Sequence, residues 1–292
     1  MNRMLAGVAL ASAAALMAAT PAQAAITQAP AKPVTAVKKQ LVPGKGVTFT
    51  ERTTLDSGRM RAVFVRSSGT YQFSRSGLAA SDITGKLNIK ASDLADLGEG
   101  SMFQSLAKPE RTIRIGTTSY LSGSVWAELL PSGKTWYKAP GGPPAGFTGI
   151  FGQPLNIVEP ATLKTLFKNA KPATGGYTGK ISVRDLRKVS AYYRASSPAK
   201  PSAKTLKSQI TWRLSVNAKG LPTRLVTIVP GNALAASDGA GEKMIVDTRY
   251  NGWGGKVSIK APAADEVTTK LDGGTGDEQE SAENLDLFNL LK

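Results

Sequence analysis

Histidine and cysteine, the side chains that most often carry nucleophilic, acid–base and metal chemistry, are both missing from this chain of 292 residues. Without them no Ser-His-Asp or Cys-His catalytic arrangement can form, and zinc lacks its usual ligands. The sequence therefore predicts a protein that is not an enzyme, with no metal site and no cofactor.

Serine–lysine chemistry is the catalytic arrangement that remains formally open. Ser105-Leu-Ala-Lys108 and Ser197-Pro-Ala-Lys200 both have the Ser-x-x-Lys spacing. The companion Ser-Asp-Asn and Lys-Thr-Gly elements of enzymes built on this motif are missing. Short matches are expected by chance in a chain rich in serine and lysine, so neither pair is assigned a catalytic role.

Two further patterns resemble functional motifs but do not satisfy their requirements. Gly133-Lys-Thr135 has the end of a phosphate-binding loop, but the glycine five positions earlier is replaced by Glu128. The carboxylates of Asp93 and Asp96 follow Ser92, a good helix N-cap, and acidic residues favour a first helical turn. A helix start therefore explains this pair better than glycosidase chemistry.

The elements that surround these residues are mostly strands. Short runs that alternate or are rich in β-branched and aromatic residues, bounded by Gly and Ser, predict strands at 59–66, 69–75, 83–90 and 111–115. A strand pair over 118–140 follows, joined at Pro131-Ser-Gly133, because proline fixes the entry of a turn and glycine supplies a free φ.

The second half of the chain alternates more strongly. Apolar side chains occupy every other position from Ile210 to Val216, as in a strand with one buried face. A turn at Ala218-Lys-Gly220 follows, and the later strands are predicted at 221–229, 243–250 and 256–260. Together they predict an antiparallel meander that closes the chain.

One helix stands out, at residues 160–171. Pro160 suits the first helical position, and Leu163, Leu166 and Phe167 form one apolar stripe. Such a helix needs a sheet to cover.

The N-terminus has the organisation of a secretory signal peptide. Arg3 precedes an apolar segment from Met4 to Ala19, and Ala22-Gln-Ala24 is a cleavage site. We expect an exported, secreted protein cleaved after Ala24. No stretch reaches the roughly 20 apolar residues of a membrane span, so no transmembrane segment is expected in the mature chain.

Composition divides the remaining chain into three parts. Residues 25–46, rich in Ala, Pro and Lys, predict a flexible leader, 47–267 a folded β domain, and 268–292 an acidic, disordered tail. Because cysteine is missing, neither disulfides nor a lipidated N-terminal cysteine are expected.

The net charge of +16 predicts attraction to polyanions, with solubility alone as the alternative interpretation. Outside the cell these are anionic cell-wall polymers and anionic lipid headgroups, so nucleic acid is not expected as a partner.

Small residues raise the possibility of a ligand cavity. Ser122, Gly123 and Ser124 occupy predicted strand positions where a packed sheet would place bulk. We interpret the missing volume as space under the sheet, with ordinary core packing as the alternative for the aromatic residues nearby. The residues predicted to line the cavity are Tyr120, Leu121, Val125, Trp126, Leu163, Leu166 and Phe167.

Several segments taken together resemble secreted and lipid-anchored carriers of the LolA and LppX/LprG type. These segments, spread over 45–267, are TSYLSGSVW followed by GKTWYKAP, GGYTGKISVRDL, TWRLSVNAKGLPTRLVTIV and TRYNGWGGKVSIKAPAADEV. The resemblance implies an α+β, mainly β fold: a curved antiparallel sheet (half-barrel) with helices covering its concave face. One departure is the position after the cut, where Ala25 replaces the lipobox cysteine of many relatives.

Two functions follow from these expectations. The resemblance implies a non-catalytic binding protein that carries or senses an acylated lipid or lipoglycan between sheet and helices. The alternative is a basic cell-envelope protein that binds anionic wall polymers or a protein partner, without a lipid ligand.

Overall fold

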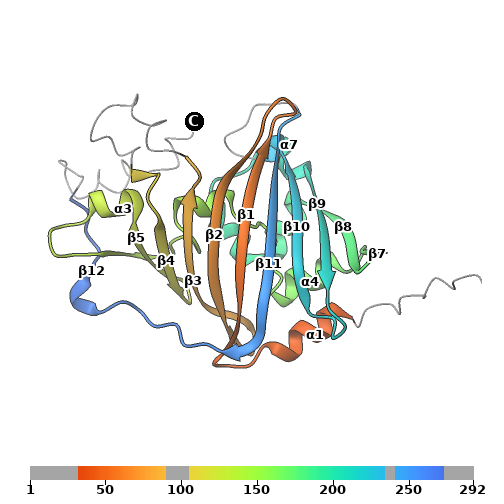
Figure 1. The fold of residues 1–292 in the computed structure, drawn as a ribbon, viewed down its shortest axis with the longest axis horizontal. Helices are drawn as coiled ribbons and strands as arrows, with labels where there is room; N and C mark the ends of the chain where they lie inside the picture. Colours follow the sequence, from red (N-terminus) through yellow and green to blue (C-terminus); the bar gives the residue numbers. More distant parts are fainter. Residues whose placement is uncertain (1–31, 90–104, 234–240, 273–292) are drawn as a thin grey trace, which may run out of the picture.

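The computed structural model describes residues 32–89, 105–233 and 241–272 (Figure 1). The strands are β1 Lys45–Asp56, β2 Arg61–Ser74, β3 Gly77–Leu87, β4 Glu110–Ile115, β5 Thr118–Gly123, β6 Trp136–Pro140, β7 Lys171–Ala173, β8 Gly176–Ser182, β9 Gln209–Val216, β10 Pro222–Pro230, β11 Lys243–Lys256 and β12 Val267–Thr268. The helices are α1 Pro33–Gln40, α3 Ser124–Leu129, η2 Phe147–Phe151, α4 Pro160–Leu166, α5 Val183–Val189, α6 Ala191–Ser196, α7 Ala203–Lys207, η3 Gly231–Ala233 and η4 Ala264–Glu266. The predicted signal peptide, the Asp93–Asp96 pair and nearly all of the predicted tail lie outside the described residues.

The strands form one curved sheet in the order β12-β6-β5-β4-β3-β2-β1-β11-β10-β9-β8-β7. All neighbours pair antiparallel except β12 and β6, which pair parallel. The first strand lies in the middle, because β1 pairs with β2 on one side and with β11 on the other. The predicted fold class, a mainly β protein built on a curved antiparallel sheet with helices on its concave face, is confirmed.

Alternation along the strands separates two faces. In β1 the side chains of Val47, Phe49 and Glu51 are buried, whereas those of Thr48 and Thr50 are exposed. The buried positions point to the concave face, which α4 and α7 cover from behind in Figure 1. The exposed positions point to the convex face, which lies toward the viewer.

The core fills the concave side. Its centre consists of apolar side chains from most strands and from the covering helices, among them Phe73, Leu155, Leu186, Leu214 and Leu225. This packing explains why a domain without disulfides folds, since about 25 cal/mol is gained for each Å² of apolar surface removed from water.

The predicted flexible leader is corrected by the structure. Its second part forms α1, which begins at Pro33, and the start of β1. Val37 and Leu41 are 2% and 6% exposed and belong to the core. The composition, rich in Ala, Pro and Lys, did not predict this helix. A few buried apolar side chains are enough to hold so short a helix against the core, and they do not form a long apolar pattern.

The structure also merges strands that the sequence separated. The predicted strands 69–75 and 59–66 are parts of β2, and β11 continues through Asn251–Gly255 instead of ending there. Gly252 and Gly254 have φ of 66° and 78°, and the pairing of β1 with β11 shifts register here. These glycines therefore accommodate an irregularity within a strand pair rather than a turn.

The predicted helix over 160–171 is shorter than expected. Helix α4 ends at Leu166, and the chain returns to the sheet as β7, which pairs with β8. The last predicted turn of the helix does not form, because β7 begins at Lys171 and the chain must leave the helix before that residue.

Candidate functional site

A cavity of about 280 Å³ opens at the end of the sheet where β1 turns into β2. One wall is the sheet itself, through the buried side chains of Ile210, Val229 and Met244. The loop around η2 and the last turn of α6 form the opposite wall. The cavity therefore lies between the concave face and its covering segments.

The lining is mainly apolar and its rim is charged. Leu55, Phe151 and Met244 contribute apolar side chains, whereas Lys243 forms an ion pair with Asp56 at 3.3 Å. Met60, in the β1–β2 turn, also borders the cavity and is 68% exposed. This combination of apolar walls and a polar mouth suits a ligand with a hydrocarbon part and a polar part.

The η2 wall is fastened to the sheet at its start by Glu110. This carboxylate accepts hydrogen bonds from the backbone N–H groups of Phe147 (3.0 Å) and Thr148 (2.6 Å). Burial raises the pKa of Glu110, and the hydrogen bonds from Thr148 and Phe147 oppose that shift. Gly146 leaves room for this carboxylate, because a Cβ at that position would press against the Glu110 side chain.

The end of the same wall is fastened by Glu51. Gln153 donates its backbone N–H to Glu51 Oε1 at 3.1 Å, and Thr248 donates its hydroxyl to Oε2 at 2.8 Å. The Gln153 side chain donates to Thr248 and accepts from Thr227. Burial raises the pKa of Glu51 to about 7, with Thr248 and Gln153 opposing the shift.

Aromatic contacts stiffen this wall. The ring of Phe151 meets that of Phe64 edge-on, with centroids 4.8 Å apart, and that of Phe147 at 6.0 Å. Thr53 also donates its hydroxyl to the carbonyl of Phe151 at 2.6 Å. The cavity wall is thus held by buried polar anchors and by ring packing, although it is a loop.

The residues predicted to line a cavity are divided between two ends of the sheet. Leu163 and Leu166 of α4 are part of the core, and Phe167 packs edge-on against Tyr177 at 4.8 Å. Helix α4 contacts α1, α5 and β8.

The other predicted residues lie near β5 and α3. Leu121 and Val125 are buried outside that core cluster, Trp126 stacks on Tyr137 at 5.9 Å, and Tyr120 pairs across from Ile113. None of the predicted residues lines the cavity described above.

The small residues that suggested a cavity have a different role. Gly123 has φ of 72°, and a Cβ there would lie 2.5 Å from the carbonyl oxygen of Pro109. Ser124 has φ of 46° and begins α3. Small side chains are needed here because the chain leaves β5 sharply for a helix.

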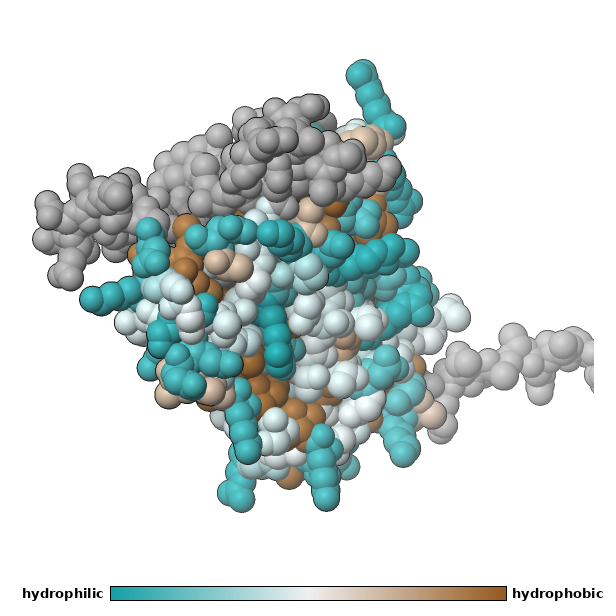
Figure 2. Space-filling model, turned by 60° about the vertical axis from the view of Figure 1, so that its left-hand side comes forward, coloured by the Kyte–Doolittle hydropathy of each residue, from teal (hydrophilic) through white to brown (hydrophobic). Residues whose placement is uncertain are grey.

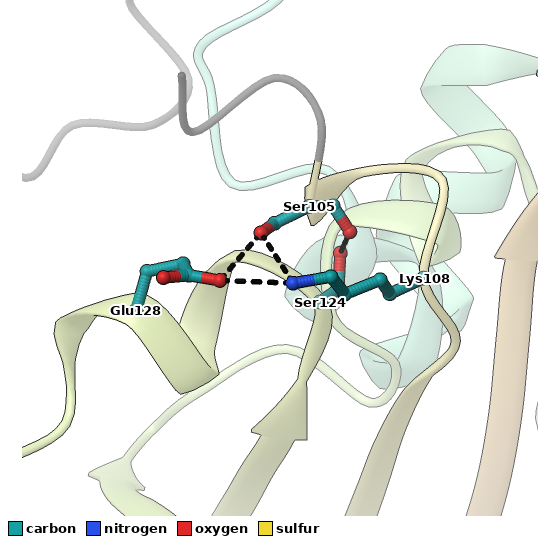
Figure 3. Close-up of polar contacts among 4 residues, drawn as sticks. All are labelled: Ser105, Lys108, Ser124 and Glu128. Atoms are coloured by element: carbon teal, nitrogen blue, oxygen red, sulfur yellow. Dashed lines mark hydrogen bonds and ion pairs between the residues drawn. The ribbon is translucent and has the colours of Figure 1, made fainter. Parts of the chain in front are cut away.

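Ser105 and Lys108, one of the Ser-x-x-Lys pairs, lie close together (Figure 3). Lys108 Nζ is 3.4 Å from Ser105 Oγ, but it also forms an ion pair with Glu128 at 3.1 Å. Ser105 donates its hydroxyl to Glu128 at 2.7 Å, and its carbonyl accepts from Ser124. Ser105 and Lys108 hold the pKa of Glu128 below its usual value.

This arrangement does not suit serine–lysine catalysis. A general base must be neutral to take the proton of the serine hydroxyl. Lys108 is instead paired as an ammonium with a carboxylate, and Ser105 gives its proton to that carboxylate as a hydrogen bond. The cluster ties the segment before β4 to α3.

The described residues offer neither a metal site nor a membrane-spanning helix. The described residues contain no group of three or more acidic side chains placed to hold a metal ion. Among them, no helix has the length and apolar character required to cross a bilayer.

Two features of the sequence mark the position of this cavity. Residues 147–154, Phe-Thr-Gly-Ile-Phe-Gly-Gln-Pro, combine aromatic and apolar side chains with glycine between strands. Met60 stands between Arg59 and Arg61 in a turn. Both place apolar side chains where an ordinary surface loop carries polar ones.

Comparison with known proteins gives similar structures only. No protein-family model matches the sequence, and no curated protein matches it. Similar solved structures include a LolA superfamily protein from Nitrosomonas europaea, with a TM-score of 0.30 and 9% identity over 74% of this chain and 89% of that one.

Two others are a hypothetical protein from Chlamydia trachomatis (TM-score 0.29, 11% identity, 80% and 98% covered) and a DUF1329 family protein from Desulfovibrio piger (0.26, 9%, 76% and 94%). With TM-scores at or below 0.30, nothing about ligand or activity follows from these likenesses.

Proposed function

We propose that this protein is an exported, non-catalytic carrier that holds an acyl chain of a lipid or lipoglycan in the cavity beside η2. The observation that carries the proposal is an apolar cavity with a charged rim, between the concave face and its covering loop. Hydrocarbon gains about 0.8 kcal/mol for each CH₂ group buried, so such a cavity favours an acyl chain over a polar ligand.

The size of the cavity supports a chain rather than a whole lipid. Its volume of about 280 Å³ is close to the lower end of ligand pockets, roughly 300–1,000 Å³. The polar part of a bound lipid would remain at the mouth, where the ion pair of Lys243 with Asp56 lies.

The polar groups in and behind the lining support binding rather than catalysis. The amide of Gln153 donates to Thr248 and accepts from Thr227, and Glu51 is occupied by Gln153 and Thr248. Each of these groups is engaged in fixing the wall, which suits a rigid binding site.

The test is to fill the cavity without altering the core. Ser196 is half-buried and lines the cavity, whereas Ala191 lies in the same helix, is exposed and does not line it. We expect Ser196→Trp to weaken binding of dansyl-undecanoic acid to the delipidated protein at least tenfold. Ala191→Trp adds the same indole outside the cavity and should bind like the wild type.

Native mass spectrometry of the purified wild type gives a second readout. We expect a mass increment of a host lipid that delipidation removes and that Ser196→Trp lacks. Absence of any acyl binding by the delipidated wild type would refute the carrier function. Equal binding by both tryptophan variants would show that the acyl chain does not enter this cavity.

A further inference from the structure

Like charges face one another on the convex side of the sheet. Lys86 of β3 lies directly opposite Arg66 of β2, and Arg66 lies directly opposite Arg52 of β1. All three side chains are exposed. Adjacent strands are about 4.8 Å apart, so the cations repeat at that spacing along one line across the sheet.

This placement works against stability. Like charges directly opposite each other on neighbouring strands are destabilising. Among the residues that the structure describes, neither Arg66 nor Lys86 forms a salt bridge, and Arg52 reaches Asp247 only at 3.8 Å. The row therefore contains two cations, Lys86 and Arg66, that no acidic side chain of the described residues neutralises, and a third, Arg52, that faces Asp247 on β11.

A second row continues the pattern next to the first. Thr84, Ser68 and Thr50 lie opposite one another on β3, β2 and β1, which places hydroxyl groups beside the cations. The same row then reaches Arg249 of β11 and Arg224 of β10, again directly opposite each other.

Asp247 compensates only part of this charge. It accepts two hydrogen bonds from Arg224, both at 2.7 Å, and Arg249, Arg224 and Arg52 all lower its pKa, against the effect of burial. We call the whole surface the cationic track; it consists of Lys86, Arg66, Arg52, Arg249 and Arg224 with Thr84, Ser68 and Thr50.

We propose that the cationic track binds a linear anionic polymer with closely repeated phosphate or carboxylate groups. Arginine recognises both groups through its planar fork of N–H donors, and hydroxyl groups add hydrogen bonds to the same oxygens. Successive anionic groups of one polymer would neutralise cations on successive strands, which removes the repulsion between them.

The composition of the two rows distinguishes this polymer from other polyanions. Across β3, β2, β1, β11 and β10 these rows contain no aromatic side chain, which single-stranded nucleic acid needs for base stacking. Their single apolar member, Val226, is half-buried, so the rows offer nothing to insert into a bilayer. The face of the molecule in Figure 2 carries many hydrophilic side chains, with brown apolar areas between them.

The track is independent of the proposed cavity. It lies on the convex face, whereas the cavity opens on the concave side. Failure of polymer binding would leave the carrier function untouched, and failure of acyl binding would leave the track untouched.

The test compares two pairs of neutralised cations in the full-length chain. Arg66→Gln with Lys86→Gln changes the track, whereas Lys164→Gln with Lys168→Gln removes the same charge from exposed positions in and just after α4. The probes are long-chain polyphosphate and poly-L-glutamate, measured by isothermal titration calorimetry at several salt concentrations.

We expect the track variant to bind about tenfold more weakly than wild type and to lower the salt dependence of log Kd by about 2. The stronger of the two probes then identifies the anionic group. The melting temperature of the track variant should equal that of wild type or exceed it, because a like-charge contact is removed. The α4 variant should bind like wild type.

Equal weakening in both double variants would overturn the proposal, because net charge alone would then explain the binding. Absence of polymer binding by the wild type would overturn it as well. Tighter binding of single-stranded DNA or of phosphatidylglycerol vesicles than of either polymer would overturn the assigned partner class.

Discussion

Glu51 and Glu110 are the residues on which the cavity wall depends. They lie in one cross-strand row on the concave face, with Ser67 and Gly85 between them. Each carboxylate accepts backbone N–H groups from one end of the η2 segment. A buried carboxyl group is costly unless it is hydrogen-bonded, so loss of these contacts would release the wall.

Glu51 makes the stability of the protein depend on pH. Because burial raises its pKa from 4.5 to about 7, the folded state holds a proton that the unfolded state has lost between these values. Its contribution to stability is therefore complete below about pH 4.5 and is lost as the pH rises through about 7.

We expect Glu51→Gln to remove this dependence, since the amide keeps the shape of the side chain but does not titrate. As the pH rises from 4.5 to 8, the free energy of unfolding of wild type should fall by about 3 kcal/mol relative to that of the variant. Urea denaturation across this range measures it. Glu128→Gln, at an exposed position, is the control, and a Glu51→Gln curve parallel to wild type would contradict the assignment.

At the scale of elements, α1 shows how a short helix becomes part of the fold. Lys38 and Lys39 lie in its last turn, where the helix dipole favours cations. Val37 and Leu41 enter the core beside α4, which contacts α1. Tertiary packing, rather than helix propensity, therefore holds this segment.

Leu41→Ala tests whether α1 belongs to the folded unit. Truncating a buried leucine costs about 2–5 kcal/mol, so we expect a loss of that size in the free energy of unfolding. Val42→Ala is a matched control in the next position, because Val42 is 47% exposed. Equal stability of both variants would indicate a leader that does not contribute to the core.

At the scale of the whole molecule, the central position of β1 ties the two halves of the chain together. Its pairing with β11 joins strands nearly two hundred positions apart, as in Glu51 with Thr248. The meander at each side extends outward from this pair. One sheet therefore carries the covered cavity on one face and the cationic track on the other.

Export is the remaining prediction at this scale. We expect the protein recovered from culture medium to begin at Ala25-Ile-Thr27, which N-terminal sequencing measures. Removal of residues 1–24 leaves α1 intact, because that helix begins at Pro33. A secreted chain that retains Met1 would contradict the proposed cleavage.

Local sequence patterns are sufficient to predict the class of the fold and which side chains of its strands point inward. Alternation at positions 210–216 predicted a strand with Trp212 and Leu214 buried, and both are at most 2% exposed. Period-two alternation is local information, because neighbouring side chains of a strand point to opposite faces regardless of what packs there. The turn at Ala218-Lys-Gly220 was also predicted from local residue types, and it connects β9 to β10 in the structure.

The position of the cavity follows from tertiary packing and cannot be read from local patterns. Small residues at 122–124 look the same in sequence whether they leave room for a ligand or permit a sharp bend, and only the approach of Pro109 shows that they permit a bend. The row of Lys86, Arg66 and Arg52 is likewise invisible in the sequence. Register between strands follows from the packing of the whole sheet, so residues distant in the chain become neighbours only when that packing is complete.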